Sequence, residues 1–264
     1  MYAVNYHRAS SVADAAKRGG GDAKYLSGGM TLLPAMKTRL AAPSDLVDLS
    51  RLEELRGVRI SGRTVTIGAA TTHYEVSTDA GLKSAFPLLC RFASLIGDPA
   101  VRYKGTIGGS IANNDPAADY PAALVALGAT VVTDKREIAA EDFFTGLFET
   151  ALDDGEIVTA VRFDIPEKAG WEKFRNPASR YAIVGVFVAK KGDGVRVAVT
   201  GAGDDGVFRS KEIEAALAKG LDQKALDGIS VPSDGLMGDI HASPEYRANL
   251  IAVMAKRAVA QAAG

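Results

Sequence analysis

The chain has a single cysteine, Cys90, among its 264 residues. One thiol forms no disulfide within a chain, and iron–sulfur clusters usually take four thiolates, so both a disulfide framework and a cluster held by this chain alone are excluded. Cys90 lies in an apolar helical stretch, where a buried and inert thiol is expected. The three histidines, His7, His73 and His241, lack the spacing of metal ligands, so no metal site is predicted.

Neither sign of charge dominates, because 31 basic residues stand against 32 acidic ones. Binding to nucleic acid or to an anionic membrane needs a basic excess on one surface, so neither partner is expected. No segment approaches the ~20 consecutive apolar residues of a membrane span, and the first residues lack the apolar core of a signal peptide. We therefore expect a cytoplasmic protein without an integral membrane segment, with a peripheral position at the inner face of the membrane as the alternative.

Motifs of self-contained catalysis are also missing. The sequence has no G-x-S-x-G nucleophile elbow, no P-loop and no evident acid/base pair. Residues 201–206 match G-x-G-x-x-G after a predicted strand, but a Rossmann site needs a helix that begins inside the motif. Asp204 and Asp205 would also face the pyrophosphate, so a β-turn is the favoured interpretation. No catalytic residue is assigned to this chain.

Glycine, in contrast, is abundant, with 28 residues, about one and a half times its usual share. Two Gly-Gly segments stand out, Ser27-Gly28-Gly29-Met30-Thr31 and Thr106-Ile107-Gly108-Gly109-Ser110. Glycine reaches positive φ at little cost and lets successive backbone N–H groups approach an anion, so two such turns suit the two phosphates of a dinucleotide. The alternative is a pair of ordinary tight turns.

A polar run follows the second Gly-Gly segment and contains Asp115 and Asp119. A carboxylate beside a phosphate site suits hydrogen bonds from sugar or ribityl hydroxyls. The alternative is local: Asp115 would form an Asx turn, and Asp119 would cap the helix expected from Pro121. The capping and ligand-binding roles of Asp119 are compatible with each other.

The order of predicted elements changes along the chain. The first 50 residues predict a β-α-β-α-β unit, with helices at residues 11–18 and 31–39 and strands at 24–26 and 46–49. A hairpin at residues 58–67 and helices at 85–96 and 121–127 come next. A boundary near residues 166–170 precedes two long strands, 183–189 and 195–200, and alanine-rich helices at 212–219 and from 244 onward.

Residues 100–124 strongly resemble the FAD-binding medium subunits of molybdenum hydroxylases, most of all that of aerobic carbon monoxide dehydrogenase. The specific part is the run T-I-G-G-x-x-A-x-x-D-P-A-A-D at residues 106–119. Similar segments at residues 26–29, 171–175, 179–182 and 243–247 extend the resemblance along nearly the whole chain.

The resemblance implies an α+β chain of two domains. Residues 1–168 would form a two-lobed FAD-binding domain of the p-cresol methylhydroxylase (PCMH) type, with lobes at residues 1–55 and 56–168. Residues 169–264 would form a domain like the C-terminal domain of the carbon monoxide dehydrogenase flavoprotein, a three-stranded antiparallel sheet with helices.

The resemblance also implies that FAD is bound noncovalently. The two Gly-Gly segments would hold the pyrophosphate, Asp119 would bond flavin hydroxyls, and Tyr181 would lie near the ring system. Arg175 stands where the family commonly has Lys, and it keeps the charge with a different donor geometry. The expected cofactor-binding residues are Ser27, Gly28, Gly29, Met30, Thr31, Thr106, Ile107, Gly108, Gly109, Ser110, Asp119, Val158, Arg175 and Tyr181. Of these, Met30 replaces a frequent His or Thr, and Val158 replaces a usual Leu.

The function implied is that of an FAD-dependent oxidoreductase subunit. It would accept electrons from a small subunit with a 2Fe–2S cluster and pass them to an external acceptor, while a large subunit would carry molybdopterin, in a dimer of heterotrimers. The substrate site of such an assembly lies on another chain, so carbon monoxide, an N-heterocycle and an aldehyde are all compatible with this sequence. The alternatives are a self-contained FAD-dependent oxidase and a nonenzymatic nucleotide-binding assembly protein.

Overall fold

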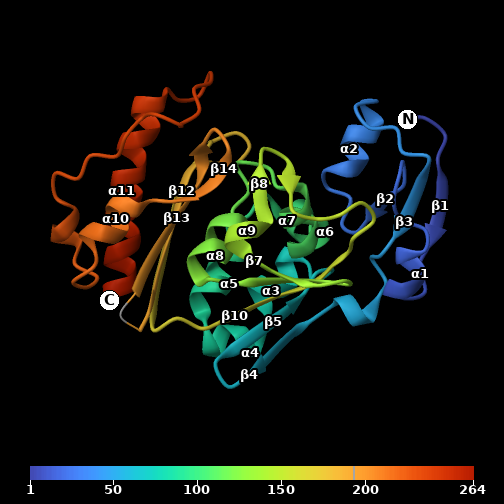
Figure 1. Cartoon of the computed structure of the whole chain (residues 1–264), viewed down its shortest axis with the longest axis horizontal. Coiled ribbons are helices and arrows are strands. Elements are labelled where there is room, and N and C mark those ends of the chain that lie inside the picture. The colour runs from blue at the N-terminus through green and yellow to red at the C-terminus, as the bar shows by residue number, and fades with distance from the viewer. Residues whose placement is uncertain (193) are drawn as a thin grey trace. The chain divides into compact units, whose positions relative to one another are not determined.

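The structure is a computed structural model that describes residues 1–192 and 194–264. Contacts divide the chain into two compact units, each assembled from three segments (Figure 1). Unit 1 comprises Met1–Asn113, Thr130–Ala139 and Ala151–Arg162, and unit 2 comprises Asn114–Ala129, Ala140–Thr150 and Phe163–Gly264. The expected mixture of helices and sheets is confirmed. The boundary expected at residue 168 divides the chain by its resemblance to two known domains, whereas the two units are defined by contacts. The expected boundary therefore stays a prediction.

The N-terminal part of unit 1 is the β-α-β-α-β unit that the sequence predicts. Its three strands form a parallel sheet in the order β1-β3-β2, so β2 is an edge strand. Ser11 caps the first helix by accepting a hydrogen bond from the backbone N–H of Asp14, as its capping pattern predicts. The elements are β1 (Asn5–Arg8), α1 (Val12–Ala16), β2 (Lys24–Leu26), α2 (Leu32–Lys37), β3 (Asp45–Asp48) and the 3₁₀ turn η1 (Glu53–Leu55).

The second sheet of unit 1 has five strands in the order β4-β5-β10-β6-β7. The predicted hairpin is present, with Val58 opposite Ile67. The strands are β4 (Val58–Ser61), β5 (Thr64–Gly68), β10 (Val158–Asp164), β6 (Thr130–Thr133) and β7 (Glu137–Ala139). The helices are α3 (His73–Thr78), α4 (Ala80–Ala85), α5 (Pro87–Ser94), α6 (Pro99–Lys104) and α7 (Ile107–Asn113). Cys90 of α5 is buried as expected, and burial raises the pKa of its thiol.

Unit 2 has a four-stranded antiparallel sheet, β11 to β14 in chain order, against which the long helix α11 packs (Figure 1). A Cβ at Gly170 of β11 would lie 1.9 Å from the Ala258 carbonyl oxygen of α11, so glycine permits this close packing. The strands are β11 (Lys168–Arg175), β12 (Ala182–Lys191), β13 (Gly194–Gly203), β14 (Gly206–Arg209), and the hairpin β8 (Phe144–Gly146) with β9 (Glu149–Thr150). The helices are α8 (Tyr120–Leu127), α9 (Ala140–Phe143), α10 (Lys211–Ala216), the 3₁₀ turn η2 (Gln223–Leu226) and α11 (Pro244–Ala263).

The short strand β14 adds a fourth strand to the three that the resemblance implies for this sheet. It also accounts for the G-x-G-x-x-G match. Gly203 of β13 pairs with Gly206 of β14, so Asp204 and Asp205 form the turn of a hairpin and no helix begins there. The β-turn interpretation of residues 201–206 is confirmed.

None of the helices in residues 1–192 and 194–264 combines the length and the apolar character that crossing a membrane requires.

Candidate functional site

The two Gly-Gly segments, which lie 79 residues apart in the chain, meet in unit 1. The Ser27 and Thr106 hydroxyl oxygens are 3.1 Å apart, within hydrogen-bond distance. The backbones also touch, because a Cβ at Gly28 would lie only 1.9 Å from the Lys104 carbonyl oxygen. Glycine at position 28 therefore lets the two segments pack against each other.

The second Gly-Gly segment is the first turn of helix α7, not a separate tight turn. Thr106 caps this helix, and its hydroxyl oxygen accepts a hydrogen bond from the Gly109 N–H at 3.1 Å. The Ile107 and Gly108 N–H groups donate to carbonyls of the segment between β5 and α3, at 3.1 and 2.8 Å. The Ser110 N–H donates to the Thr106 carbonyl oxygen at 2.9 Å, so four N–H groups of the segment expected to bind a phosphate have partners within the chain. Gly109 itself is exposed and Ser110 is half-buried.

The first Gly-Gly segment is open. The N–H groups of residues 28–31 have no acceptor among the residues that the structure describes. Gly29 has a φ of +69°, a left-handed conformation that favours glycine. The Thr31 side chain makes no capping bond to α2, and Met30 is exposed. Of the two segments, this one presents the unpaired donors that an anion needs.

Asp119 is a buried carboxylate of unit 2, with its side chain only 4% exposed. Its Oδ2 accepts a hydrogen bond from Lys173 Nζ at 2.6 Å. Its Oδ1 is also buried and has no hydrogen-bond partner in the described chain. Asp119 occupies the N-cap position of α8, but its side chain makes no capping bond, so the carboxylate is not used by the helix.

The segment that leads to Asp119 is tied to strand β13. The Thr200 hydroxyl lies 2.6 Å from the Ala118 carbonyl oxygen and 3.0 Å from that of Pro116. Asp115 Oδ1 accepts the Ala117 N–H at 2.8 Å, which confirms the Asx turn. These bonds hold the backbone in front of Asp119 through groups other than its carboxylate.

Lys173 is the residue of this site that the sequence analysis missed. It lies in β11, and its side chain is 4% exposed beside Asp119. Burial raises the pKa of Asp119 more than the charge and hydrogen bond of Lys173 lower it. The sequence does contain a signal for Lys173. Residues two apart on a strand share a face, so Lys173 lies on the same face as Trp171, which is expected to be buried. A lysine on a buried face needs an acidic partner.

The remaining expected residues are dispersed. Tyr181 directly precedes β12 in unit 2 and is 51% exposed; partial desolvation and the Asp115 and Asp119 carboxylates raise its pKa. Arg175, the last residue of β11, is exposed, and its expected place near the flavin stays a prediction. Val158 begins β10 in unit 1 and is buried.

Each of the two units, taken by itself, presents unsatisfied groups whose chemistry fits a part of FAD. Its pyrophosphate oxygens are hydrogen-bond acceptors, and the N–H groups of residues 28–31 are donors without an acceptor among the described residues. Its ribityl and ribose hydroxyls are hydrogen-bond donors, and the buried Oδ1 of Asp119 is an acceptor without a donor among the described residues. Its ring system offers an aromatic face to an exposed tyrosine such as Tyr181. No group of three or more His, Cys, Asp or Glu residues in the described chain has the arrangement of a metal site.

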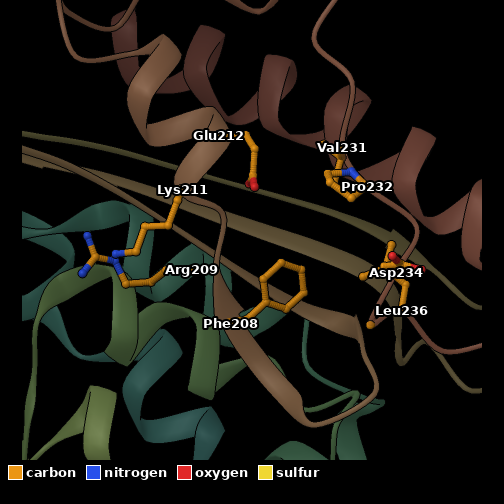
Figure 2. A pocket seen from close by; sticks show the side chains of 9 residues that line it. Phe208, Arg209, Lys211, Glu212, Val231, Pro232, Asp234 and Leu236 are labelled. Atoms are coloured by element: carbon orange, nitrogen blue, oxygen red, sulfur yellow. The ribbon is translucent and has the colours of Figure 1, made fainter.

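A separate pocket in unit 2 contains none of the expected residues. It is lined by nine residues of β14, α10 and the segment 231–236 (Figure 2). Arg209, which borders it, donates to Glu214 Oε1 at 2.8 Å and to Glu141 Oε1 at 2.9 Å. Its guanidinium is thus already paired, and the pocket offers no free cation to an anionic ligand from this residue.

Comparison with known proteins agrees with this chemistry. Residues 2–167 match the family described as the FAD binding domain in molybdopterin dehydrogenase. The carbon monoxide dehydrogenase medium chain of Afipia carboxidovorans is 34% identical, over 98% of this chain and 96% of the relative. The glyceraldehyde dehydrogenase medium chain of Sulfolobus acidocaldarius is also 34% identical, over 98% of each chain.

Among solved structures, a chain of reconstituted CO dehydrogenase from Oligotropha carboxidovorans superimposes with a TM-score of 0.88 at 34% identity, covering 99% of this chain and 98% of that one. The likeness therefore extends over the whole chain and not the FAD-binding part alone. The chain belongs to the molybdenum hydroxylase family as an FAD-binding medium subunit, an oxidoreductase flavoprotein whose cofactor is FAD.

Proposed function

We propose that this chain is the flavin subunit through which a multi-subunit molybdenum hydroxylase passes electrons from a 2Fe–2S partner to an external acceptor. FAD supplies the redox chemistry when bound, and the protein contributes position and electrostatics. The proposal is supported by relatives whose names describe medium chains of dehydrogenases. It also explains why the sequence contains no G-x-S-x-G nucleophile elbow and no evident acid/base pair.

The observation that carries the cofactor-binding role is the buried Oδ1 of Asp119. Leaving a buried polar atom without a partner costs roughly 1–3 kcal/mol, and more for a charged group. A hydroxyl donor from the cofactor would remove this cost, so a ligand that brings one gains affinity at this residue. Lys173 keeps the other carboxylate oxygen occupied at 2.6 Å and so leaves Oδ1 for the ligand.

Each expected residue receives a role in this proposal. The N–H groups of residues 28–31 bind the pyrophosphate, with Gly109 and Ser110 as further contacts from α7. Tyr181 lies against the ring system, and Val158 provides an apolar contact. Arg175 supplies positive charge at the surface, whereas Lys173 orients Asp119.

The partners we propose are a small iron–sulfur subunit and a large molybdopterin subunit, assembled as a dimer of heterotrimers. We also propose the domain division at residue 168, with a PCMH-type FAD-binding domain before it. The two relatives compared above are named for carbon monoxide and glyceraldehyde. Similar medium chains thus serve different substrates, which supports a substrate site on a partner chain.

The cofactor role is tested by Asp119→Asn, with Asp115→Asn as a matched control from the same segment. Losing a charged hydrogen bond of ~1.5–3 kcal/mol predicts a rise in the FAD dissociation constant of about tenfold to a hundredfold. Titration of the purified full chain with FAD, followed by flavin absorbance and fluorescence, measures it. The control should change affinity less than threefold. Equal affinity of wild type and Asp119→Asn would exclude the assigned role.

The electron-transfer role needs its own experiment. Affinity purification of the tagged full chain should yield a complex that contains a 2Fe–2S cluster, visible by electron paramagnetic resonance after reduction, and molybdopterin. Turnover of a small substrate by the isolated FAD-loaded chain would instead favour the self-contained oxidase. A chain that binds FAD but purifies alone and transfers no electrons would favour the assembly protein.

A further inference from the structure

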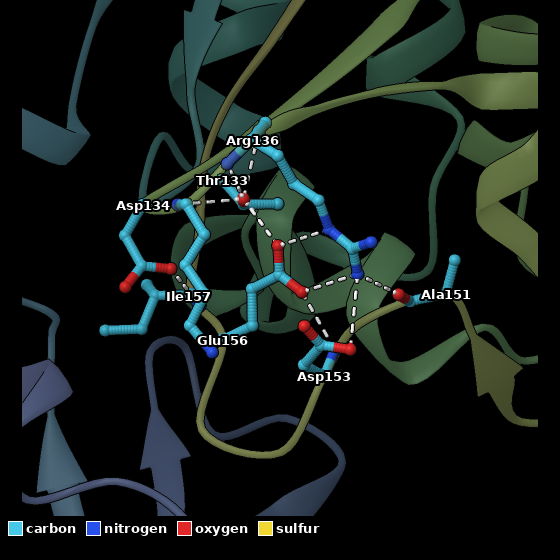
Figure 3. Close-up of polar contacts among 8 residues, drawn as sticks. Thr133, Asp134, Arg136, Ala151, Asp153, Glu156 and Ile157 are labelled. Carbon is cyan, nitrogen blue, oxygen red and sulfur yellow. Dashed lines mark hydrogen bonds and ion pairs between the residues drawn. The ribbon is translucent and has the colours of Figure 1, made fainter.

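Glu156 is a fully buried carboxylate in unit 1 whose hydrogen-bonding capacity is filled by neighbouring residues (Figure 3). Its Oε1 lies 2.6 Å from the Thr133 hydroxyl and 3.1 Å from Arg136 Nε. Its Oε2 lies 3.0 Å from Arg136 Nη2 and 2.8 Å from the Asp153 backbone nitrogen. We call this set, Thr133, Arg136, Asp153 and Glu156, the Arg136–Glu156 clamp. Its bidentate geometry is the strongest form of such a pair.

Arg136 of the clamp and its neighbour Asp134 bond the two ends of the loop at residues 151–157 to the turn between β6 and β7. At the start of the loop, Arg136 Nη2 donates to the Ala151 carbonyl oxygen at 2.7 Å. At its end, the Ile157 N–H donates to Asp134 Oδ1 at 2.8 Å, and the Asp134 N–H donates to the Ile157 carbonyl at 2.9 Å (Figure 3). The loop is therefore bonded to this turn at both of its ends.

The middle of this loop reaches strand β2. The Gly155 carbonyl oxygen accepts a hydrogen bond from the Tyr25 hydroxyl at 2.8 Å, and Asp154 Oδ2 accepts one from the Gly21 N–H at 2.8 Å. Gly155 has a φ of +71°, and a Cβ there would lie 3.1 Å from the Gly20 nitrogen. Burial and the Asp134 and Asp154 carboxylates raise the pKa of Tyr25 to about 12.

Both ends of this connection lead to residues proposed to bind FAD. Tyr25 is the middle residue of β2, an edge strand with β3 on one side, and the chain enters the open Gly-Gly segment two residues later. Ile157 is buried in the same apolar cluster as Val47 of the N-terminal sheet, and Val158 follows it directly.

We propose that Glu156 and Arg136 are positioning residues for FAD. The clamp sets the place of residues 28–31 through the bond between Gly155 and Tyr25. This inference rests on the proposed function, because it assigns the clamp a role only if those residues contact FAD. A clamp that served stability alone would change the thermal midpoint of the chain but not its affinity for FAD.

The first test compares Tyr25→Phe with Tyr6→Phe in the purified full chain. Tyr6 is the matched control because it lies in β1, the opposite edge strand of the same sheet, and its hydroxyl bonds to Asp48. Each variant loses one hydroxyl and one hydrogen bond. We expect Tyr25→Phe to raise the FAD dissociation constant about tenfold and Tyr6→Phe less than twofold, with similar falls in the thermal midpoint of the FAD-free chain. Equal affinities of the two variants would overturn the inference.

The second test is a double-mutant cycle with Glu156→Gln, which removes the charge that holds Arg136. If the clamp acts through the Gly155–Tyr25 bond, Glu156→Gln should weaken FAD binding about tenfold in the wild-type background and less than twofold in Tyr25→Phe. Independent losses that multiply to about a hundredfold would overturn the inference. Tight FAD binding by the wild type with no loss in any variant would refute the clamp alone, whereas a wild-type chain that binds no FAD would refute the proposed function.

Discussion

At the scale of single residues, the glycines of the two Gly-Gly segments differ in how much space the structure leaves for a side chain. A Cβ at Gly28 would meet the Lys104 carbonyl oxygen at 1.9 Å, and one at Gly108 would meet the Ala69 Cβ at 2.5 Å. Both positions need glycine because backbones pack closely there. At Gly109 an added Cβ would meet only the Thr106 Oγ1, at 3.0 Å, and the residue is exposed. Gly109 is thus the glycine at which an added Cβ would meet one side-chain oxygen and no backbone atom.

This contrast predicts effects of different size for Gly28→Ala and Gly109→Ala. Gly28→Ala should lower the free energy of unfolding by about 2–3 kcal/mol, because the backbone must shift to admit the Cβ. Gly109→Ala should change it by less than about 1 kcal/mol, because the gain in helix propensity is offset by the 3.0 Å contact of the added Cβ with Thr106 Oγ1, while FAD binding weakens severalfold. Urea unfolding of the FAD-free chain and FAD titration measure both quantities. If Gly109→Ala destabilised the chain as much as Gly28→Ala, the structural distinction between the two glycines would be wrong.

At the scale of elements, strand β11 places Lys173 beside Asp119, 54 residues away in the chain. The local motif predicts Asp119 as a ligand of flavin hydroxyls and Arg175 as a basic residue near the flavin, but it predicts no basic partner for Asp119. Lys173 and Arg175 both lie on β11, and the sequence pattern alone does not show which of the two side chains is buried. The structure does, because the register shifts between Phe174 and Arg175 and leaves Arg175 exposed.

The ion pair predicts a strong effect of Lys173→Met and a partial rescue by a second substitution. Removing the cation leaves a buried carboxylate unpaired, which typically costs about 3–5 kcal/mol of stability. The double variant Lys173→Met with Asp119→Asn removes both charges and should recover at least ~2 kcal/mol of this loss. Thermal and urea unfolding of the four proteins in the cycle measure it. Additive losses in the double variant would show that the two side chains are not coupled.

Helix α7 illustrates a second difference between local pattern and element. The pair Gly108-Gly109 resembles a turn because glycine weakens a helix. Thr106 nevertheless caps the helix, and the Gly108 N–H donates to the Ala69 carbonyl at 2.8 Å. Tertiary hydrogen bonds and close packing thus outweigh the low helix propensity of glycine. The local pattern therefore predicts a turn at these two glycines, where the structure has a helix.

At the scale of the whole molecule, two buried groups make the chain sensitive to acid. Burial lowers the pKa of His73 to about 4, and its ring packs against Gly105, next to the cap of α7. Hydrogen bonds from Arg136, Thr133 and the Asp153 backbone outweigh desolvation and lower the pKa of Glu156 to about 2. Both groups have a lower pKa in the folded chain than in the unfolded chain. As the pH decreases, the unfolded chain therefore binds these protons first, and the free energy of unfolding falls.

The two groups act in different pH windows. His73 should remove stability between pH 6.5 and about 4, and Glu156 between pH 4.5 and about 2. A difference of ~2.5 pKa units for His73 corresponds to roughly 3 kcal/mol. Urea unfolding from pH 7 to 4 should therefore show a steep loss for wild type and for the exposed control His241→Gln. His73→Gln should be flatter across this range, and parallel curves for all three proteins would contradict the assignment.

The sequence by itself determined the family, the cofactor and most of the regular elements. These follow from local patterns: a specific run of residues at 106–119, helix caps such as Ser11, and alternation in the strands. Only the tertiary structure decided that Lys173 pairs with Asp119, that Gly28 packs on Lys104, and that Glu156 is linked to Tyr25 through one loop. The physical reason is that burial, unpaired polar atoms and close packing arise between residues far apart in the chain, which no local pattern specifies.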